Sequence, residues 1–215
     1  AGKALGAAVE AEVERHGDGR GKESGGQSIT LVFLLVQSKV SPNGKRGFPQ
    51  AILPPPPYPM QDGDTIQIAH VVRDMETAMH RYHDQLGMGP WAVYELKPPL
   101  LYDSLVRGEP SDHTYLIALA QHGNMQYELI QPLTGRSLYD EFLEERGEGL
   151  HHVKFYYRDC AAALRHYAGK GYSVVQSGRI DEDEFHYLDT EKDLGIIVEI
   201  GNAGTIRPPE RWVPA

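Results

Sequence analysis

The sequence predicts an α+β protein built from two tandem βαβββ modules, the first at residues 65–133 and the second at residues 148–202. A strand, a helix and three strands are expected from Thr65 onward, and the same order of elements begins again near Glu148. In addition, Asp74 and Asp159 each open a predicted helix at the same place in the two halves. A supersecondary unit that recurs within one chain indicates an internal repeat.

In the first module, the apolar and β-branched segment 66–72 predicts a strand. Segment 74–87 predicts a helix, with Asp74 as the N-cap and Gly87 as the stop signal. The strand candidates that follow are 91–96, a segment near Tyr102 to Arg107, 114–121 and 124–133.

In the second module, segment 149–157 predicts a strand and segment 158–171 a helix that ends in a glycine. Three further strands are expected within 172–180, 184–190 and 194–202, followed by a tail at 203–215. The charged run at 141–149, between the modules, is typical of a solvated helix face with a glycine stop.

Composition excludes several classes of protein. Mean hydropathy is −0.44 and no apolar run approaches 18 residues, so we expect no membrane partner. With a single cysteine, Cys160, the chain can form neither an intramolecular disulfide nor a cysteine-rich zinc site, which favours a cytoplasmic location. From Met60 onward, 14 basic residues stand against 25 acidic ones, a net charge of −11 that disfavours binding to nucleic acid.

Residues 1–59 differ from the rest, because Gly, Ser and Pro are scattered through them without a period of 2 or 3.6. We expect this segment to be disordered. All five methionines lie at or after Met60, so the natural start is expected at Met60, with a non-native extension before it and one domain at 60–215. A genuine flexible arm or targeting segment is the alternative.

Polar residues occupy matched positions in the two modules. Counting back seven residues from Asp74 and from Asp159 leads to Gln67 and to His152. The last strand of each module also carries a glutamate among apolar residues, Glu128 and Glu199. A carboxylate in such a strand costs several kcal/mol to bury unless it is paired or bound to a cation.

The segments ELIQPL (128–133) and SLYDEFLEERGEGLHHV (137–153) carry a resemblance to a known family. The chain, from Ile66 to about Asn202, resembles the vicinal oxygen chelate superfamily, which includes glyoxalase I, methylmalonyl-CoA epimerase, extradiol dioxygenases and the fosfomycin and bleomycin resistance proteins. The resemblance implies that the modules curl into a shared cup of mixed sheet. It also implies a small-molecule substrate and a homodimer.

By this resemblance, the metal ligands would be Gln67, Glu128, His152 and Glu199, a set similar to that of the eukaryotic type of glyoxalase I. Nitrogen and oxygen ligands of this kind suit a divalent Zn, Ni, Co, Mn or Fe ion. Glu199 or Glu128 would also act as the catalytic base. The alternative is a metal-free binding cup.

Two further histidines are set aside as ligands. His151 should face away from His152 because side chains alternate along a strand. His70, three residues after Gln67, has the wrong parity too, but it would replace Gln67 if the register were shifted by one.

Three residues are expected near the substrate. Lys154 and Tyr156 share the inward parity of His152. The lysine would bind a carboxylate or phosphate of the substrate, or else be ion-paired within the protein. Trp91 would line an apolar pocket, with Tyr94 and Tyr187, unless these rings are ordinary core residues.

Departures from the family limit the function. Val71, Pro132 and Glu148 occupy positions from which glyoxalase I grips glutathione, and none is the Arg or Asn used there. Strand 114–121 lacks the extra acid that the epimerase needs. We therefore expect a metal-dependent lyase or isomerase that moves a proton next to a carbonyl on a substrate other than a glutathione adduct. A metal-free sequestration protein and an extradiol-type dioxygenase are the alternatives.

Overall fold

The computed structural model describes residues 59–214. Apart from Pro59, the expected disordered or non-native extension therefore lies outside the described residues. In the described part of the chain, no helix has both the length and the apolar character needed to cross a membrane.

The two modules have the same topology. The first contains β1 (Thr65–Val71), α1 (Met75–Leu86), β2 (Trp91–Leu96), β5 (Thr114–His122) and β6 (Met125–Thr134). The second contains β7 (Gly149–Tyr156), α3 (Cys160–Ala168), β8 (Val174–Ile180), β9 (Asp183–Leu188) and β10 (Ile197–Gly201). Their strand orders, β2-β5-β6-β1 and β8-β9-β10-β7, correspond strand for strand. The first strand of each module is parallel to its last.

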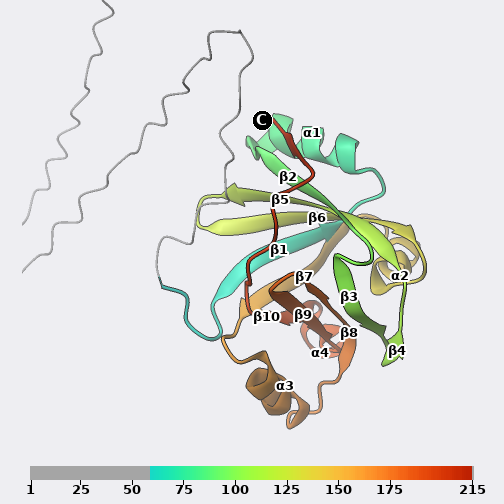
Figure 1. Cartoon of the computed structure of the whole chain (residues 1–215), viewed down its shortest axis with the longest axis vertical. Helices are drawn as coiled ribbons and strands as arrows, with labels where there is room; N and C mark the ends of the chain where they lie inside the picture. Colours follow the sequence, from blue (N-terminus) through green and yellow to red (C-terminus); the bar gives the residue numbers. More distant parts are fainter. Residues whose placement is uncertain (1–58, 215) are drawn as a thin grey trace, which may run out of the picture. The chain divides into compact units, whose positions relative to one another are not determined.

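Strands β1 and β7 pair antiparallel and join the modules into one mixed sheet of 11 strands within the described residues. Figure 1 shows this sheet curling into a half-barrel, as the predicted α+β fold requires. The remaining elements are β3 (Leu101–Val106), β4 (Glu109–Pro110), α2 (Leu138–Glu145), α4 (Glu191–Leu194) and β11 (Arg211–Val213).

Each module receives a strand at its outer edge from elsewhere in the chain. The strand candidate near Tyr102 to Arg107 forms β3, but it pairs with β8 of the second module and with the short strand β4, and not with β1, β2, β5 or β6. The segment after residue 203, expected only as a tail, contains β11, which pairs with β2. Local sequence patterns do not report such long-range pairings, because they reflect only which faces are buried.

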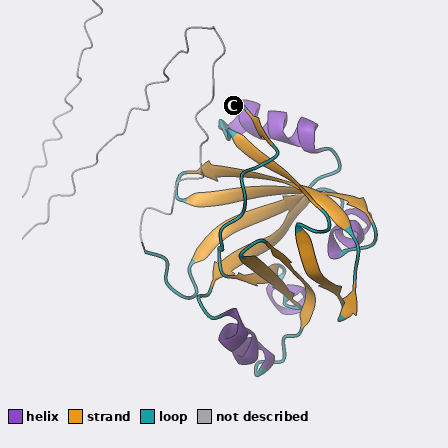
Figure 2. Ribbon diagram, in the orientation of Figure 1, coloured by secondary structure: helices purple, strands orange, loops and turns teal. Residues whose placement is uncertain are grey.

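Three hydrophobic clusters hold the sheet and helices together. One lies under α1 and includes Met75, Met79 and Trp91, and another lies under α3 and includes Cys160 and Ile200. The third spans the inner face of both modules and includes four side chains of α2: Leu138, Tyr139, Phe142 and Leu143. Helix α2 thus buries one face in the inner cluster. Helices α1 and α3 lie at opposite ends of the domain as viewed in Figure 2.

Equivalent aspartates cap the two module helices, as predicted. Asp74 Oδ1 accepts a hydrogen bond from Thr77 N (2.7 Å), and Asp159 Oδ1 accepts one from Ala162 N (2.8 Å). Helix α1 ends at Gly87, whose φ of 66° lies in the left-handed region that glycine adopts readily. Helix α3 ends at Ala168, earlier than expected.

Removing either cap should weaken the fold. We expect Asp74→Ala and Asp159→Ala each to lower the free energy of unfolding by about 1 kcal/mol, because a helix N–H group loses its partner. Urea denaturation measures the change. Asp84→Ala, at an exposed position within α1, is the control, and a loss as large as that of the cap variants would contradict the capping role.

Candidate metal centre

Four neighbouring strands in the middle of the sheet, in the order β6-β1-β7-β10, carry the candidate ligands. Ala69 of β1 lies opposite both Glu128 of β6 and His152 of β7. Lys154 of β7 lies opposite Glu199 of β10. Because paired residues share a face of the sheet, these polar side chains all point into the cup.

Three of the four predicted ligands meet at one point. His152 Nε2 lies 2.8 Å from Glu199 Oε2 and 3.5 Å from Glu128 Oε2. The exposed fractions of the three residues are 0% for His152, 2% for Glu199 and 8% for Glu128. These three side chains, which come from both modules, therefore lie together in the cup.

The fourth predicted ligand, Gln67, makes a different contact. It is buried on β1, and its Nε2 donates a hydrogen bond to Gln126 Oε1 at 2.6 Å. In the sheet it lies opposite Gln126 and Lys154, two residues along β1 from Ala69. The amide thus belongs to the same inner face, and within residues 59–214 it makes no hydrogen bond to the other three ligands.

A buried lysine completes the cluster. Lys154 Nζ lies 3.0 and 3.2 Å from the two Asp183 carboxylate oxygens and 3.1 Å from Glu199 Oε1. Gly201 makes room for it, since a Cβ there would stand 2.3 Å from Lys154 Cε. Of the two roles expected for this lysine, the ion-paired one fits the structure. Asp183 was missed; the run of four acids at 181–184 was the available signal.

The environment shifts the ionisation of the cluster. Burial alone would lower the pKa of His152, but the neighbouring carboxylates of Glu128 and Glu199 raise it to about 9. Burial raises the pKa of Glu128. For Glu199 the effect of burial is outweighed by Lys154 and His152, which lower its pKa. The positive groups of the protein therefore compensate Glu199 more fully than Glu128.

The prediction that His151 faces away from His152 is wrong. The register of β7 against β1 jumps from His152 to Leu150, so His151 is the extra residue of a β-bulge. A bulge interrupts the alternation of side chains. His151 is 1% exposed, its Nδ1 lies 2.9 Å from His152 Nδ1, and burial holds its pKa well below the usual value.

The other expected residues are divided between the two faces. His70 packs against Tyr82 of α1 (ring centroids 5.7 Å apart), so it lies on the outer side, as its parity predicted. Trp91 is fully buried in the cluster under α1, which means that it is a core residue and does not line the cup. Tyr156 is half-buried at the end of β7.

Tyrosine side chains surround the cluster. The Tyr187 ring centroid lies 4.6 Å from that of His152, and the Tyr187 hydroxyl is 2.7 Å from the Tyr139 hydroxyl. Tyr139 comes from α2, a contribution that the sequence analysis missed. The apolar spacing of Leu138, Tyr139 and Phe142 could have indicated a buried helix face.

The donor set fits a divalent ion in part. When two atoms bind the same metal ion at about 2.1 Å each, with a ligand–metal–ligand angle of roughly 90–110°, they lie about 3.0–3.4 Å from each other. The distances from His152 Nε2 to the two carboxylates are close to this range, and this buried nitrogen has no well-aligned hydrogen-bond partner. Within residues 59–214, however, no group of three or more His, Cys, Asp or Glu side chains forms a preassembled metal cluster.

Two βαβββ modules joined edge to edge, with polar side chains gathered on the inner face, define a class of cup-shaped mixed-sheet proteins. A family model described as the Glyoxalase/Bleomycin resistance protein/Dioxygenase superfamily matches residues 66–187. Since this is more than half of the chain, the protein belongs to that superfamily, the vicinal oxygen chelate proteins. Members of the family typically bind divalent metals and act on small molecules.

Individual relatives are more distant. The chain is 49% identical over 39 residues to the uncharacterized protein YqjC of Bacillus subtilis, a match that spans 18% of this chain and 28% of that protein. A solved hypothetical protein from Bacillus halodurans is similar with a TM-score of 0.51 and 18% identity, over 70% of this chain and 100% of that one. This likeness shows the fold alone.

The methylmalonyl-CoA epimerase of Mycobacterium tuberculosis is similar to this chain with a TM-score of 0.47 and 22% identity. The likeness covers 68% of this chain and 89% of the epimerase.

The ion pairs of Lys154 give a stability prediction. We expect Lys154→Met to lower the free energy of unfolding by about 3–5 kcal/mol, because Asp183 and Glu199 would lose their buried cation. Asp183→Asn should cost less, about 1–2 kcal/mol, since Lys154 keeps Glu199. Urea denaturation of both variants measures the difference. The exposed Lys192→Met is the control, and equal losses at 154 and 192 would show that the buried pairs do not form in solution.

Proposed function

We propose that this protein is a divalent-metal-dependent lyase or isomerase of the glyoxalase type. It would move a proton next to the carbonyl of a small molecule other than a glutathione adduct. The observation that carries the proposal is the meeting of His152 Nε2 with the carboxylates of Glu128 and Glu199, each from a different strand. Membership of the superfamily supports it.

His152, Glu128 and Glu199 would hold the ion, with Gln67 as the fourth ligand. Gln67 could join them only by turning its amide, which donates to Gln126. A bound Zn, Ni, Co, Mn or Fe ion would supply a Lewis acid for the carbonyl oxygen. The two carboxylates would balance the charge of the ion, so that a neutral substrate could bind without unbalanced charge.

Glu128 is the better candidate for the catalytic base. Both oxygens of Glu199 already have cationic partners, since Oε2 faces His152 and Oε1 faces Lys154. Glu128 has the single, longer contact of 3.5 Å and is the most exposed of the three ligands. It can therefore take a proton with the smaller loss of ion pairing.

A metal-free binding protein is the second candidate, and one observation favours it. Lys154 gives the cluster a cation of its own, which compensates Glu199 without any ion. In this case the cup would sequester a small molecule without turnover. Nothing comparable favours an extradiol-type dioxygenase, whose iron site uses two histidines and one glutamate.

We also propose that the metal-dependent enzyme is a homodimer. Light scattering of the purified protein tests this.

The metal proposal predicts which histidine matters. After metal-supplemented expression, we expect His152→Ala and Glu199→Ala each to lower metal affinity at least about tenfold, because each removes a ligand. Elemental analysis and competition with a chelator measure this. His70→Ala is the matched control, since His70 lies on the outer face of β1 beside Tyr82.

Two results would overturn the metal proposal. One is a wild-type chain that retains less than about 0.2 metal ions after such expression. The other is a loss of affinity in His70→Ala equal to that in His152→Ala. Where metal binds, metal-dependent exchange of the α-hydrogens of small α-hydroxyketones with deuterium from the solvent would separate the enzyme from a binding protein.

A further inference from the structure

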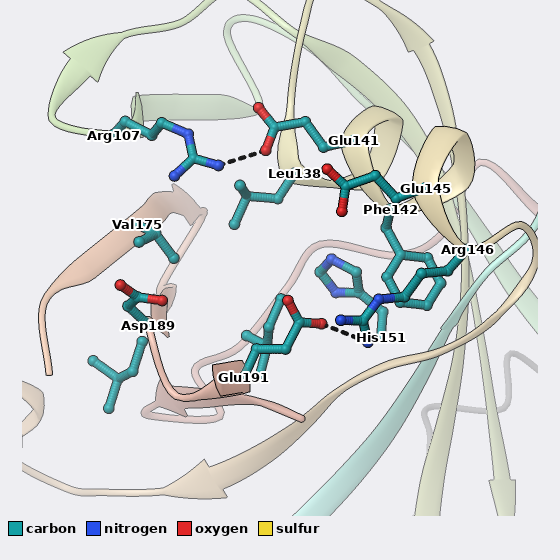
Figure 3. Close-up of a pocket in the computed structure, with 12 residues that line it drawn as sticks. Arg107, Leu138, Glu141, Phe142, Glu145, Arg146, His151, Val175, Asp189 and Glu191 are labelled. Carbon is teal, nitrogen blue, oxygen red and sulfur yellow. Dashed lines mark hydrogen bonds and ion pairs between the residues drawn. The ribbon is translucent and has the colours of Figure 1, made fainter. Parts of the chain in front are cut away.

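A pocket of about 120 Å³ opens beside α2, and its lining residue His151 contacts the candidate ligand His152. Its walls come from α2, the start of β8, the turn after β3, and the segment from the end of β9 to β10. Neither Gln67 nor any of the three ligands that meet in the cup lines it. Figure 3 shows acidic and basic side chains around its opening, with the His151 imidazole among them.

Five of the twelve residues that line the pocket are apolar, and the other seven are charged or polar. Leu138 and Phe142 of α2, together with Ile197 of β10, belong to the inner hydrophobic cluster and also line the pocket. A cavity of about 150 Å³ holds benzene, so this pocket has room for one small ring. The mixture of apolar and charged side chains favours a ligand that has both a ring and polar groups.

The charges around the opening favour a cation. Arg107 pairs with Glu141 (2.5 Å) and Arg146 pairs with Glu191 (2.9 Å). Two further lining carboxylates, Glu145 and Asp189, make no ion pair within residues 59–214. Four carboxylates against two guanidinium groups leave the lining with a net charge of −2. Such a field attracts a positively charged ligand.

The His151 side chain adds a polar group to the lining. It is 1% exposed, and its Nδ1 is engaged with His152 Nδ1. Its Nε2 is buried without a hydrogen-bond partner. The tautomer decides only whether this nitrogen donates or accepts, and a hydroxyl group can do either. An unpaired buried nitrogen of this kind is a reason to expect a ligand with a polar atom at that place.

We propose that the pocket beside α2 is a second ligand site, which binds a small cyclic or aromatic amine with a hydroxyl group at its far end. The ammonium group lies between Glu145 and Asp189, the ring contacts Leu138, Phe142 and Ile197, and the hydroxyl meets His151 Nε2. The site does not need the metal, so it can be tested whether or not the cup proves to be a metal centre.

Three probes separate the parts of this recognition. We expect para-hydroxybenzylamine to bind about tenfold more tightly than para-cresol, which lacks the ammonium group. Benzylamine, which lacks the hydroxyl, should bind about threefold more weakly than para-hydroxybenzylamine. Titration of the full ¹⁵N-labelled chain, followed by amide chemical shifts, gives each dissociation constant.

Charge variants test the position of the ammonium group. Since the chain is acidic overall, any amine is attracted to it weakly, and the control must remove the same charge elsewhere. Glu145→Gln with Asp189→Asn should weaken para-hydroxybenzylamine at least about fivefold. Glu144→Gln with Asp193→Asn removes two charges from the same segments but outside the pocket, and it should leave affinity unchanged.

A pocket-filling variant completes the test. Val175→Phe should abolish binding of all three probes while leaving the charges in place, provided that its thermal transition shows a folded protein. The proposal is overturned if the Glu144 and Asp193 variant weakens binding as much as the Glu145 and Asp189 variant. It is also overturned if para-cresol binds as tightly as para-hydroxybenzylamine, or if Val175→Phe folds and still binds.

Discussion

Hydrogen bonds between β1 and β7 join the two modules into one sheet and determine which of their side chains can meet. Because the strands are antiparallel, Ala69 comes to lie between Glu128 and His152. Strand β10 continues the sheet on the other side of β7, and its Glu199 lies opposite Lys154, two residues along β7 from His152. A shift of one residue in this pairing would send the polar groups of one module to the outer face. The cup, its buried charges and the position of α2 all depend on this register.

The inner face concentrates charge in a place where charge is costly. Glu128, His152, Lys154, Asp183 and Glu199 are all less than 9% exposed. Desolvation of so many ionisable groups opposes folding, and mutual pairing offsets it only where the geometry is close. The short contacts of Glu199 with His152 and Lys154 meet that condition, whereas the longer contact of Glu128 does not. A fold that retains such a cluster retains it at the expense of stability, which is typical of a functional site.

The sequence alone predicted the repeated topology, the capping aspartates and three side chains that meet in the cup. These follow from local periodicity and from a common register, which the helix starts at Asp74 and Asp159 provided. Three features could not be found in this way. The bulge at His151 depends on a register mismatch between β7 and β1. The Asp183 contact depends on where the start of β9 lies relative to Lys154, and the positions of β3 and β11 depend on sheet edges formed by residues far away in the sequence. Each is a property of paired segments, and one segment by itself carries no signal of it.

The exchange of edge strands bears on how the chain folds as it is synthesised. Strand β3 is synthesised before its partner β8, so the edge of β3 that pairs with β8 stays uncovered until the second module has been made. The outer edge of β2 waits longer still, since β11 follows the entire second module. An uncovered strand edge can pair with another chain. Neither module can therefore cover its outer strand edge with its own residues alone. During synthesis, pairing of these edges with other molecules competes with completion of the sheet.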